Sequence, residues 1–487
     1  MFRAGWIAPL AVLAIALAVL LSDAGGAASR LRGALFDAYQ RQSPAAQGSA
    51  DVRVLVPDPA SLKRYGPWPW PHAVLVRLTT EAKAAGASMM VFAFALDRPD
   101  PASPQNLLAE LPPGPQNDAA RATLSAMPSP DTDFASALRA MPSVVGITLD
   151  PAQPGAAPLI KAHFIYLGPK APFAHAPLAH DAAPSLAELE SAAAGTGALN
   201  LILDADGTLR RMPLLFRLGA AIVPSLDAEA LRLSLGETTL TVKGDEGDLG
   251  AYGDRPGIAA MVSRKGDLPT APDGSFWIAF SKSARDVAVS ALDGAAPPSL
   301  GDAILFLGAP GAMVKTPLGY RDVAHIQARA MENILDASML RRPVSALEAE
   351  AVWLLLFGLG TIFLSQRFGI FAASLLTAGG IAGAGLISWH LYLANHALFD
   401  AATPGAGLLL VFACGVGLRM RRVMRARSAL RLAFADSLPR AVIDKIARRP
   451  FLLKLDGENR TITYLACGVR GFAGLAASFR NDPAAFT

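Results

Sequence analysis

Four long apolar stretches dominate the hydrophobic pattern of the chain. They occupy residues 4–21, 349–365, 368–394 and 404–418. A helix needs about 20 mostly apolar residues to cross a bilayer, and the glycines repeated in the late stretches are typical of membrane helices, in which small residues let backbones approach closely. The pattern therefore predicts four transmembrane helices, with a buried helical hairpin of a soluble protein as the alternative for the late ones. The first stretch is expected to be an anchor, or else a cleaved signal peptide.

Between the first and second apolar stretches, residues 30–345 alternate strand-like and helical patterns. Residues 52–56 form a β-rich run, residues 72–85 follow a helical period that Gly86 ends, and residues 89–95 form another apolar run. A strand, a helix and a strand within about 45 residues make a βαβ unit, which favours parallel pairing. The fold class predicted for this region is an α/β domain. Further strands are expected at 144–149, 163–167, 199–203, 276–280 and 303–307, a helix at 324–335, and long surface loops at 97–118 and 169–184.

The composition fits a membrane protein that also has a folded domain. Of the 487 residues, 52% are hydrophobic and 17% are charged, whereas about a quarter of the residues in soluble domains are charged. These values exclude a disordered protein. The two cysteines, Cys414 and Cys467, are too few for a disulfide framework or a cysteine zinc site.

The positive charge is concentrated in one block. Residues 419–449 contain ten Lys or Arg and two Asp or Glu, although the whole chain has a net charge of only +4. Such a block argues against nucleic-acid binding by the protein as a whole, and for a basic linker at 419–455 beside a membrane surface. Arg3, Arg367 and this block fall on one side of four spans. The positive-inside rule then predicts a cytoplasmic N terminus and tail, and an extracytoplasmic domain at 30–345.

Several local motifs resemble those of a known family. They are Leu62–Pro71 (Leu-Lys-Arg-Tyr-Gly-Pro-Trp-Pro-Trp-Pro), Asn200–Pro213, Pro224-Ser225-Leu226 and Leu305–Pro343. These motifs and the three spans that follow them resemble the corresponding parts of bacterial receptors with a CHASE type 2 (CHASE2) extracellular sensor domain. The resemblance extends over roughly residues 30–420. The resemblance implies a multi-pass receptor of the bacterial plasma (inner) membrane. Ala93 and the run Met313-Val314-Lys315 stand where an Asp is usual, and Val56-Pro57-Asp58-Pro59 replaces an acidic turn, so the family's polar cluster is weakened.

Four residues of these motifs are candidates for ligand binding: Trp68, Trp70, Asp206 and Arg210. The two indoles, stiffened by flanking prolines, either stack a ligand or pack the turn against the helix that follows. Asp204 and Asp206 resemble the beginning of a calcium-binding loop, but no further acidic residue follows at the required spacing. A turn with Asp and Gly explains the same residues. We expect no metal and no cofactor in this domain.

The tail at residues 456–487 resembles the start of a class III adenylate or guanylate cyclase domain. Val469-Arg470-Gly471-Phe472 matches the segment that follows the first strand of that family. The resemblance places a metal-binding Asp at the position of Gly468, and two such carboxylates hold the Mg²⁺ ions of the reaction. Glycine has no ligand oxygen, so we expect a truncated, inactive output segment without a catalytic residue. Decay of the gene and a frameshift both remain as explanations, and the second would make the protein a cyclase with an incomplete sequence.

Together these patterns predict a signal-transduction receptor with an α/β extracytoplasmic sensor domain, α-helical transmembrane segments and a short cytoplasmic tail. The expected partners are the lipid bilayer, an unidentified extracytoplasmic small molecule or envelope protein, and a second copy of the chain; nucleic acid is not expected. The basic segment after the last span indicates either pairing of two protomers or a stop-transfer signal. A nucleotide cyclase is the alternative function. A scaffold that binds another membrane protein through its Gly-rich spans is a third.

Overall fold

In a computed structural model the chain divides into two compact units, Met1–Val416 and Gly417–Thr487. The structure describes residues 4–23, 26–100, 103–112, 114–153, 155–168, 171–244, 257–343, 345–433, 461, 463–468, 470–478 and 480.

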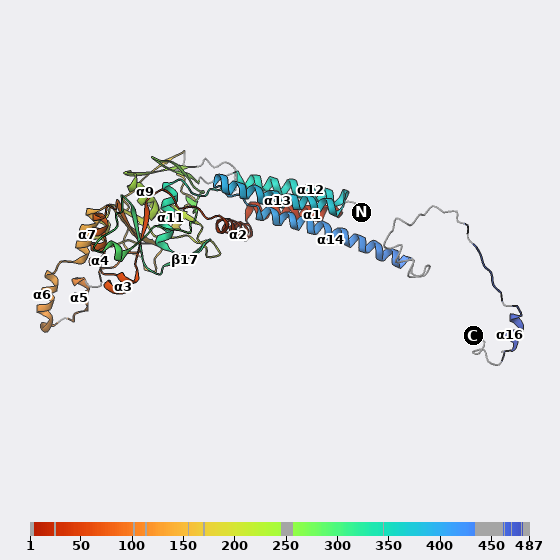
Figure 1. Cartoon of the computed structure of the whole chain (residues 1–487), viewed down its shortest axis with the longest axis horizontal. Coiled ribbons are helices and arrows are strands. Elements are labelled where there is room, and N and C mark those ends of the chain that lie inside the picture. Colours follow the sequence, from red (N-terminus) through yellow and green to blue (C-terminus); the bar gives the residue numbers. More distant parts are fainter. Residues whose placement is uncertain are drawn as a thin grey trace. The chain divides into compact units, whose positions relative to one another are not determined.

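A mostly parallel β-sheet forms the centre of the first unit (Figure 1). The strand order is β15-β1-β16-β2-β3; β7 pairs parallel with β3, and the short β6 pairs antiparallel with it. The strands are β1 Val52–Val56, β2 Met89–Ala93, β3 Ser143–Leu149, β6 Ala182–Ala183, β7 Gly195–Ala198, β15 Asp286–Ala288 and β16 Ile304–Gly308. The predicted βαβ unit is confirmed, because β1 and β2 both pair parallel with β16, which lies between them.

Side chains of the central strands alternate between two hydrophobic cores. Val54 and Val91 enter one core, whereas Leu55 and Met90 enter the other. The second core is covered by α4 His72–Ala84, α7 Pro130–Ala140, α8 Ala187–Ala192 and α10 Val289–Leu292, and the first by α9 Leu226–Ser234 and α11 Val323–Leu335. Because helices bury both faces of the sheet, its strands are continuous apolar runs. This is why the sequence pattern located β1, β2, β3 and β16.

Smaller sheets surround this three-layer domain. Their strands are β4 His163–Leu167, β5 Leu178–Ala179, β8 Arg211–Pro213, β9 Leu215–Leu218, β10 Ala221–Pro224, β11 Thr239–Gly244, β12 Ile258–Ser263, β13 Gly266–Pro269, β14 Ser275–Trp277, β17 Met313–Thr316 and β18 Gly319–Asp322. They form sheets in the orders β13-β12-β11-β4, β10-β9-β5, β14-β8 and β17-β18.

Four local expectations differ from the structure. The strand expected at 199–203 lies one segment earlier, at β7, whose Gly-Thr-Gly-Ala sequence has little strand propensity but is buried against β3. The loop expected at 97–118 contains α5 Pro104–Glu110 and the 3₁₀ turn Pro115–Asn117. The loop expected at 169–184 contains the two short strands β5 and β6, and the strand expected at 276–280 is the shorter β14. The remaining helices here are α3 Pro59–Tyr65 and α6 Asp118–Ala126.

Five further helices include the apolar stretches: α1 Ala4–Ser22, α2 Ala27–Gln42, α12 Ala346–Arg367, α13 Ile370–Asn395 and α14 Ala402–Ala433. Among the described residues, three helices (α12, α13 and α14) are long and apolar enough to cross a membrane. There are up to four if α1 and α2, bent by 72° at a short break, count as one span. Side chains of α1, α12 and α14 share one hydrophobic cluster, and the helices run side by side in Figure 1.

The second unit contains the C-terminal part of α14, which includes the first part of the basic segment, and the helix α16 Phe472–Ser478. Residues 434–460, which include most of the basic linker, lie outside the described residues. The first strand suggested by the cyclase resemblance is not present at 463–468, which have no regular secondary structure. A strand needs a neighbour to satisfy its backbone groups, and none pairs with these residues.

Candidate functional site

A buried arginine joins the sheet domain to α2. Arg210 lies just after the turn that starts at Asp204, and its side chain is 4% exposed. Its Nε and Nη2 each donate to the Asp37 carboxylate at 2.8 Å. Its Nη1 also donates to Asp204 at 2.7 Å, and its Nη2 to Asp206 at 2.6 Å. One guanidinium therefore connects α2 to both carboxylates of the turn.

The electrostatics of this cluster follow from its geometry. Burial lowers the pKa of Arg210, but the hydrogen bonds that it donates to three carboxylates outweigh this effect and raise that pKa above its ordinary value. The hydrogen bond from Arg210 in turn lowers the pKa of Asp206. Asp204 and Asp206 are thus occupied by a cation of the protein itself. In the described part of the chain, no group of three or more His, Cys, Asp or Glu could hold a metal.

Two residues after Asp37, α2 contacts the end of a membrane-length helix. Tyr39 Oη donates to Ser388 Oγ of α13 at 3.0 Å, and Tyr392 Oη of α13 donates to the Ser43 carbonyl at 2.8 Å. Tyr39 also packs against Trp389, with ring centroids 5.1 Å apart. Since Asp37 faces the sheet domain and Tyr39 faces α13, α2 is a direct link between the two.

The segment after β14 also contacts α2. The Gln40 side-chain oxygen accepts a hydrogen bond from the Phe280 amide at 2.9 Å, and the Ala45 amide donates to the Phe280 carbonyl at 2.9 Å. On the opposite side, the Asn333 side chain of α11 accepts from the Ala279 amide at 2.8 Å. Movement of α11 against the sheet would therefore be transmitted to α2 through residues 279 and 280.

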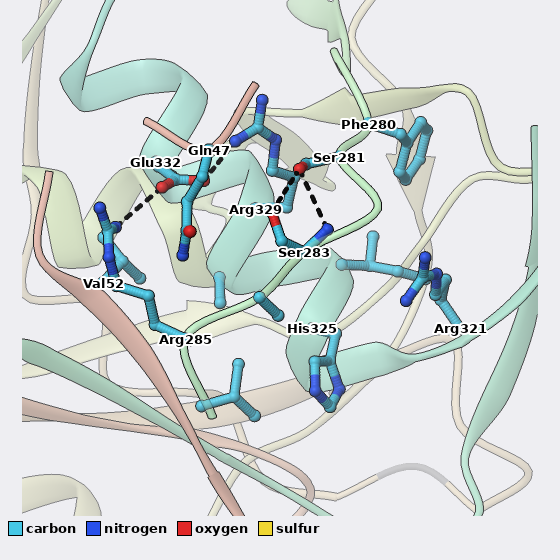
Figure 2. A pocket seen from close by; sticks show the side chains of 14 residues that line it. Gln47, Val52, Phe280, Ser281, Ser283, Arg285, Arg321, His325, Arg329 and Glu332 are labelled. Atoms are coloured by element: carbon cyan, nitrogen blue, oxygen red, sulfur yellow. Dashed lines mark hydrogen bonds and ion pairs between the residues drawn. The ribbon is translucent and has the colours of Figure 1, made fainter. Parts of the chain in front are cut away.

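A small pocket lies at this segment, between α11 and the edge of the sheet (Figure 2). Its volume is about 40 Å³. Its lining comprises Gln47, Val52, Val54, Phe280, Ser281, Ser283, Ala284, Arg285, Arg321, His325, Ile326, Ala328, Arg329 and Glu332. Three arginines against one glutamate give the lining an excess of positive charge, which suits a small anion.

Glu332 organises one end of this pocket. It lies between Arg285 and Arg329 in Figure 2 and accepts hydrogen bonds from both; the bond from Arg285 Nη1 measures 2.9 Å. Arg329 Nε donates to the Ala279 carbonyl at 2.6 Å. His325 Nε2 lies 3.0 Å from Asp286 Oδ1. The buried Glu332 ion pairs therefore join the pocket to the segment that contacts α2.

The two tryptophans of the Trp-Pro-Trp-Pro motif lie in the second core. Trp70 is 3% exposed, and its Nε1 donates to the Gly66 carbonyl at 3.0 Å. Trp68, which precedes a cis proline, packs edge-on against Phe94 at 4.9 Å and tilted against Trp70 at 5.2 Å. Both rings contact protein side chains, so the geometry gives them a packing role at the start of α4.

The sequence pattern singled out Arg210 and Asp206 but not their partner. Asp37 lies 173 positions away from Arg210, and no local signal marks it. Glu332 and Arg329 were also missed, because a mixed-charge helix face ordinarily indicates solvent. Gly468 is exposed, and apart from its chain neighbours no atom of the described residues lies within 4 Å of the place where a side chain would begin.

The chain matches the CHASE2 domain family over residues 10–364. This is most of its length, and the chain therefore belongs to that family, a family of sensor domains consistent with a signal-transduction receptor. No curated protein and no solved structure matches it.

Proposed function

We propose that this protein is a membrane receptor whose extracytoplasmic CHASE2 domain senses a stimulus and passes it through α2 to the membrane spans. The observation that carries the proposal is the double attachment of α2, with Asp37 bound to Arg210 and Tyr39 bound to Ser388. Two-sided attachment makes the position of one helix depend on both parts, which is what signal transfer between them requires.

The proposed topology has four spans in the plasma membrane, with the N terminus and tail in the cytoplasm. Arg3, Arg367 and the basic block from Arg419 then lie on the same side. Reporter fusions after Arg427 should give cytoplasmic signals, and fusions near residue 250 should give exported ones. An exported signal at Arg427 would contradict the four-span arrangement.

The proposed stimulus acts at the pocket of Figure 2. An occupant that displaced Arg329 from Glu332 would also release the Ala279 carbonyl held by Arg329 and shift the segment bonded to Gln40. Because α14 is helical from Ala402 to Ala433 without a break, a change in this span would continue into the basic segment. We further propose that this segment pairs two protomers.

Cysteine cross-linking in membranes tests this path. Single cysteines at positions 425–431, in a background lacking Cys414 and Cys467, should form symmetric cross-links with helical periodicity. Glu332→Gln and Asp37→Asn should each change which positions cross-link, whereas the exposed Glu188→Gln should not. Absence of cross-links would leave the basic segment only a stop-transfer role, and an unchanged pattern in both variants would contradict signal transfer through α2.

For the tail, we propose that it has no cyclase activity, because Gly468 supplies no metal ligand where the cyclase resemblance requires a carboxylate. The purified chain with ATP or GTP and Mg²⁺ or Mn²⁺ should form no cyclic nucleotide. Reproducible turnover above a mock preparation would overturn this proposal and favour the alternative function, a nucleotide cyclase.

A further inference from the structure

A second, open depression lies beside the β17–β18 hairpin. Its volume is about 750 Å³, and its lining comprises Arg41, Lys282, Lys315, Thr316, Pro317, Leu318, Gly319, Tyr320 and Arg321. Four of these residues are cationic and none is acidic. A concave surface with one sign of charge concentrates ions of the opposite sign.

The cations come from three separate segments. Lys315 pairs with Tyr320 across the hairpin, so both side chains project from the same face of the ribbon. Arg321 is the next residue along and contacts the Lys282 carbonyl at 3.5 Å. Arg41 comes from the last turn of α2. Asp322, the acidic residue of the hairpin, is not part of the lining; it accepts a hydrogen bond from the Ala324 amide and caps α11.

Two hydrogen bonds place this surface beside the end of a proposed span. Ser43, two residues after Arg41, accepts a hydrogen bond from Tyr392, which lies in the last turn of α13. The Ala45 amide binds the Phe280 carbonyl, two residues before Lys282. Trp389 and Tyr392 are the aromatic residues expected where a span meets the headgroup region. Arg41 and Lys282 therefore lie near the level of the lipid headgroups.

We propose that this surface binds anionic lipid headgroups of the leaflet next to the sensor domain. Tyr320, 67% exposed, and Met313, 52% exposed, supply apolar contacts beside the cations, a combination that suits the membrane interface. The surface is also connected to the Arg210–Asp37 ion pair, because Leu209, the residue before Arg210, donates its amide hydrogen to the Lys315 carbonyl at 2.8 Å. Lipid binding at the hairpin is thus positioned to influence the Arg210–Asp37 contact.

The test uses the full chain in lipid nanodiscs. Cys414 and Cys467 are replaced by Ser, and an environment-sensitive dye is attached at Tyr320→Cys. Phosphatidylglycerol, titrated into phosphatidylcholine discs, should shift the dye emission to the blue, and high salt should reverse the shift. Each cation near an anionic surface contributes roughly fivefold to binding. The triple variant Lys282→Gln/Lys315→Gln/Arg321→Gln should therefore raise the phosphatidylglycerol fraction at half-maximal shift by at least fivefold.

The matched control neutralises three exposed cations elsewhere on the sheet domain, Lys63→Gln/Lys83→Gln/Arg139→Gln, and should leave the titration unchanged. Equal loss in both triple variants, or identical emission with and without phosphatidylglycerol, would overturn the proposal. The same blue shift caused by inorganic phosphate in pure phosphatidylcholine discs would assign the surface to a soluble anion instead. This inference rests on the proposed membrane insertion. Failure to incorporate into discs would contradict that insertion, whereas incorporation without a lipid-dependent shift would contradict only the lipid surface.

Discussion

Arg210 binds Asp37 through two parallel hydrogen bonds of 2.8 Å, Nε to Oδ1 and Nη2 to Oδ2. This fork-shaped pairing fixes direction as well as distance, which a lysine could not reproduce. Because Asp37 belongs to α2 and Arg210 to the sheet domain, the pair sets how the helix docks. The same guanidinium also holds Asp204 and Asp206. A change in the position of that turn would therefore change the position of α2.

Arg210→Gln should destabilise the sheet domain strongly. The variant leaves three carboxylates close together without their cation, and breaking a buried pair typically costs about 3–5 kcal/mol. Arg211→Gln is the matched control, since Arg211 is 32% exposed and its contacts with Asp204 and Asp273 measure 3.3 and 3.2 Å. The control should cost less than about 1 kcal/mol. Thermal unfolding in nanodiscs checks both, and equal losses would contradict a special role for Arg210.

Asp58→Asn should flatten the acid dependence of stability. Asp58 caps α3, and its carboxylate accepts hydrogen bonds from the Ser290 amide at 3.0 Å and the Ser290 hydroxyl at 2.7 Å. Burial raises the pKa of Asp58, but these hydrogen bonds outweigh it and lower the pKa from 3.8 to about 2. A depressed carboxylate pKa gives stability that is present above the unfolded value and is lost as the pH falls through the folded one.

Melting temperatures between pH 5 and pH 2 test whether stability falls with decreasing pH. The wild type should lose stability as the pH falls from about 4 to about 2, and Asp58→Asn should lose less over the same interval. The exposed Asp118→Asn is the control. A wild-type slope retained in Asp58→Asn would show that other carboxylates govern this acid transition.

Asp227→Asn should stabilise the protein at neutral pH. Asp227 is 1% exposed, and neither carboxylate oxygen has a hydrogen-bond partner in the described part of the chain. Burial raises the pKa of this carboxyl well above 3.8. A raised carboxyl pKa makes stability fall as the pH rises from the unfolded toward the folded value, by about 1.4 kcal/mol per pH unit.

The neutral amide of Asp227→Asn avoids this loss. Its advantage over the wild type should therefore be larger at pH 7 than at pH 4, and the exposed Asp133→Asn should show no such difference. Chemical unfolding at the two pH values measures it. A variant less stable than the wild type at pH 7 would indicate that the charged carboxylate is required.

Two adjacent glycines of α13 should respond differently to leucine. A side chain at Gly380 would begin 2.6 Å from Phe357 of α12, whereas no atom lies within 4 Å at Gly379. Overpacking a tight contact typically costs about 1–3 kcal/mol, so Gly380→Leu should separate α12 from α13 and Gly379→Leu should be tolerated. Cross-linking between cysteines at Thr361 and Thr377, whose hydroxyl oxygens are 3.0 Å apart, reports the separation. Equal cross-linking in both variants would contradict close packing at Gly380.

Much of the architecture could be predicted from local patterns. The run at 52–56 is β1 without a change of boundary, and the three late apolar stretches are helices of membrane length, because strand and span signals depend on consecutive side chains. β7 was missed, since Gly195–Ala198 has almost no intrinsic strand preference. Its conformation comes from the pairing with β3, a contact between distant segments.

The sequence by itself determined four strands of the central sheet, β1, β2, β3 and β16, the late helices that are apolar enough for a membrane, and where the basic block lies. Only the tertiary structure decided that Asp37 meets Arg210, that Glu332 lies between Arg285 and Arg329, and that α2 touches both the sheet domain and α13. The physical reason is range. Hydrophobic periodicity depends on neighbouring residues. A buried ion pair forms only when the fold brings two distant residues together, and nothing in the local sequence around one partner identifies the other.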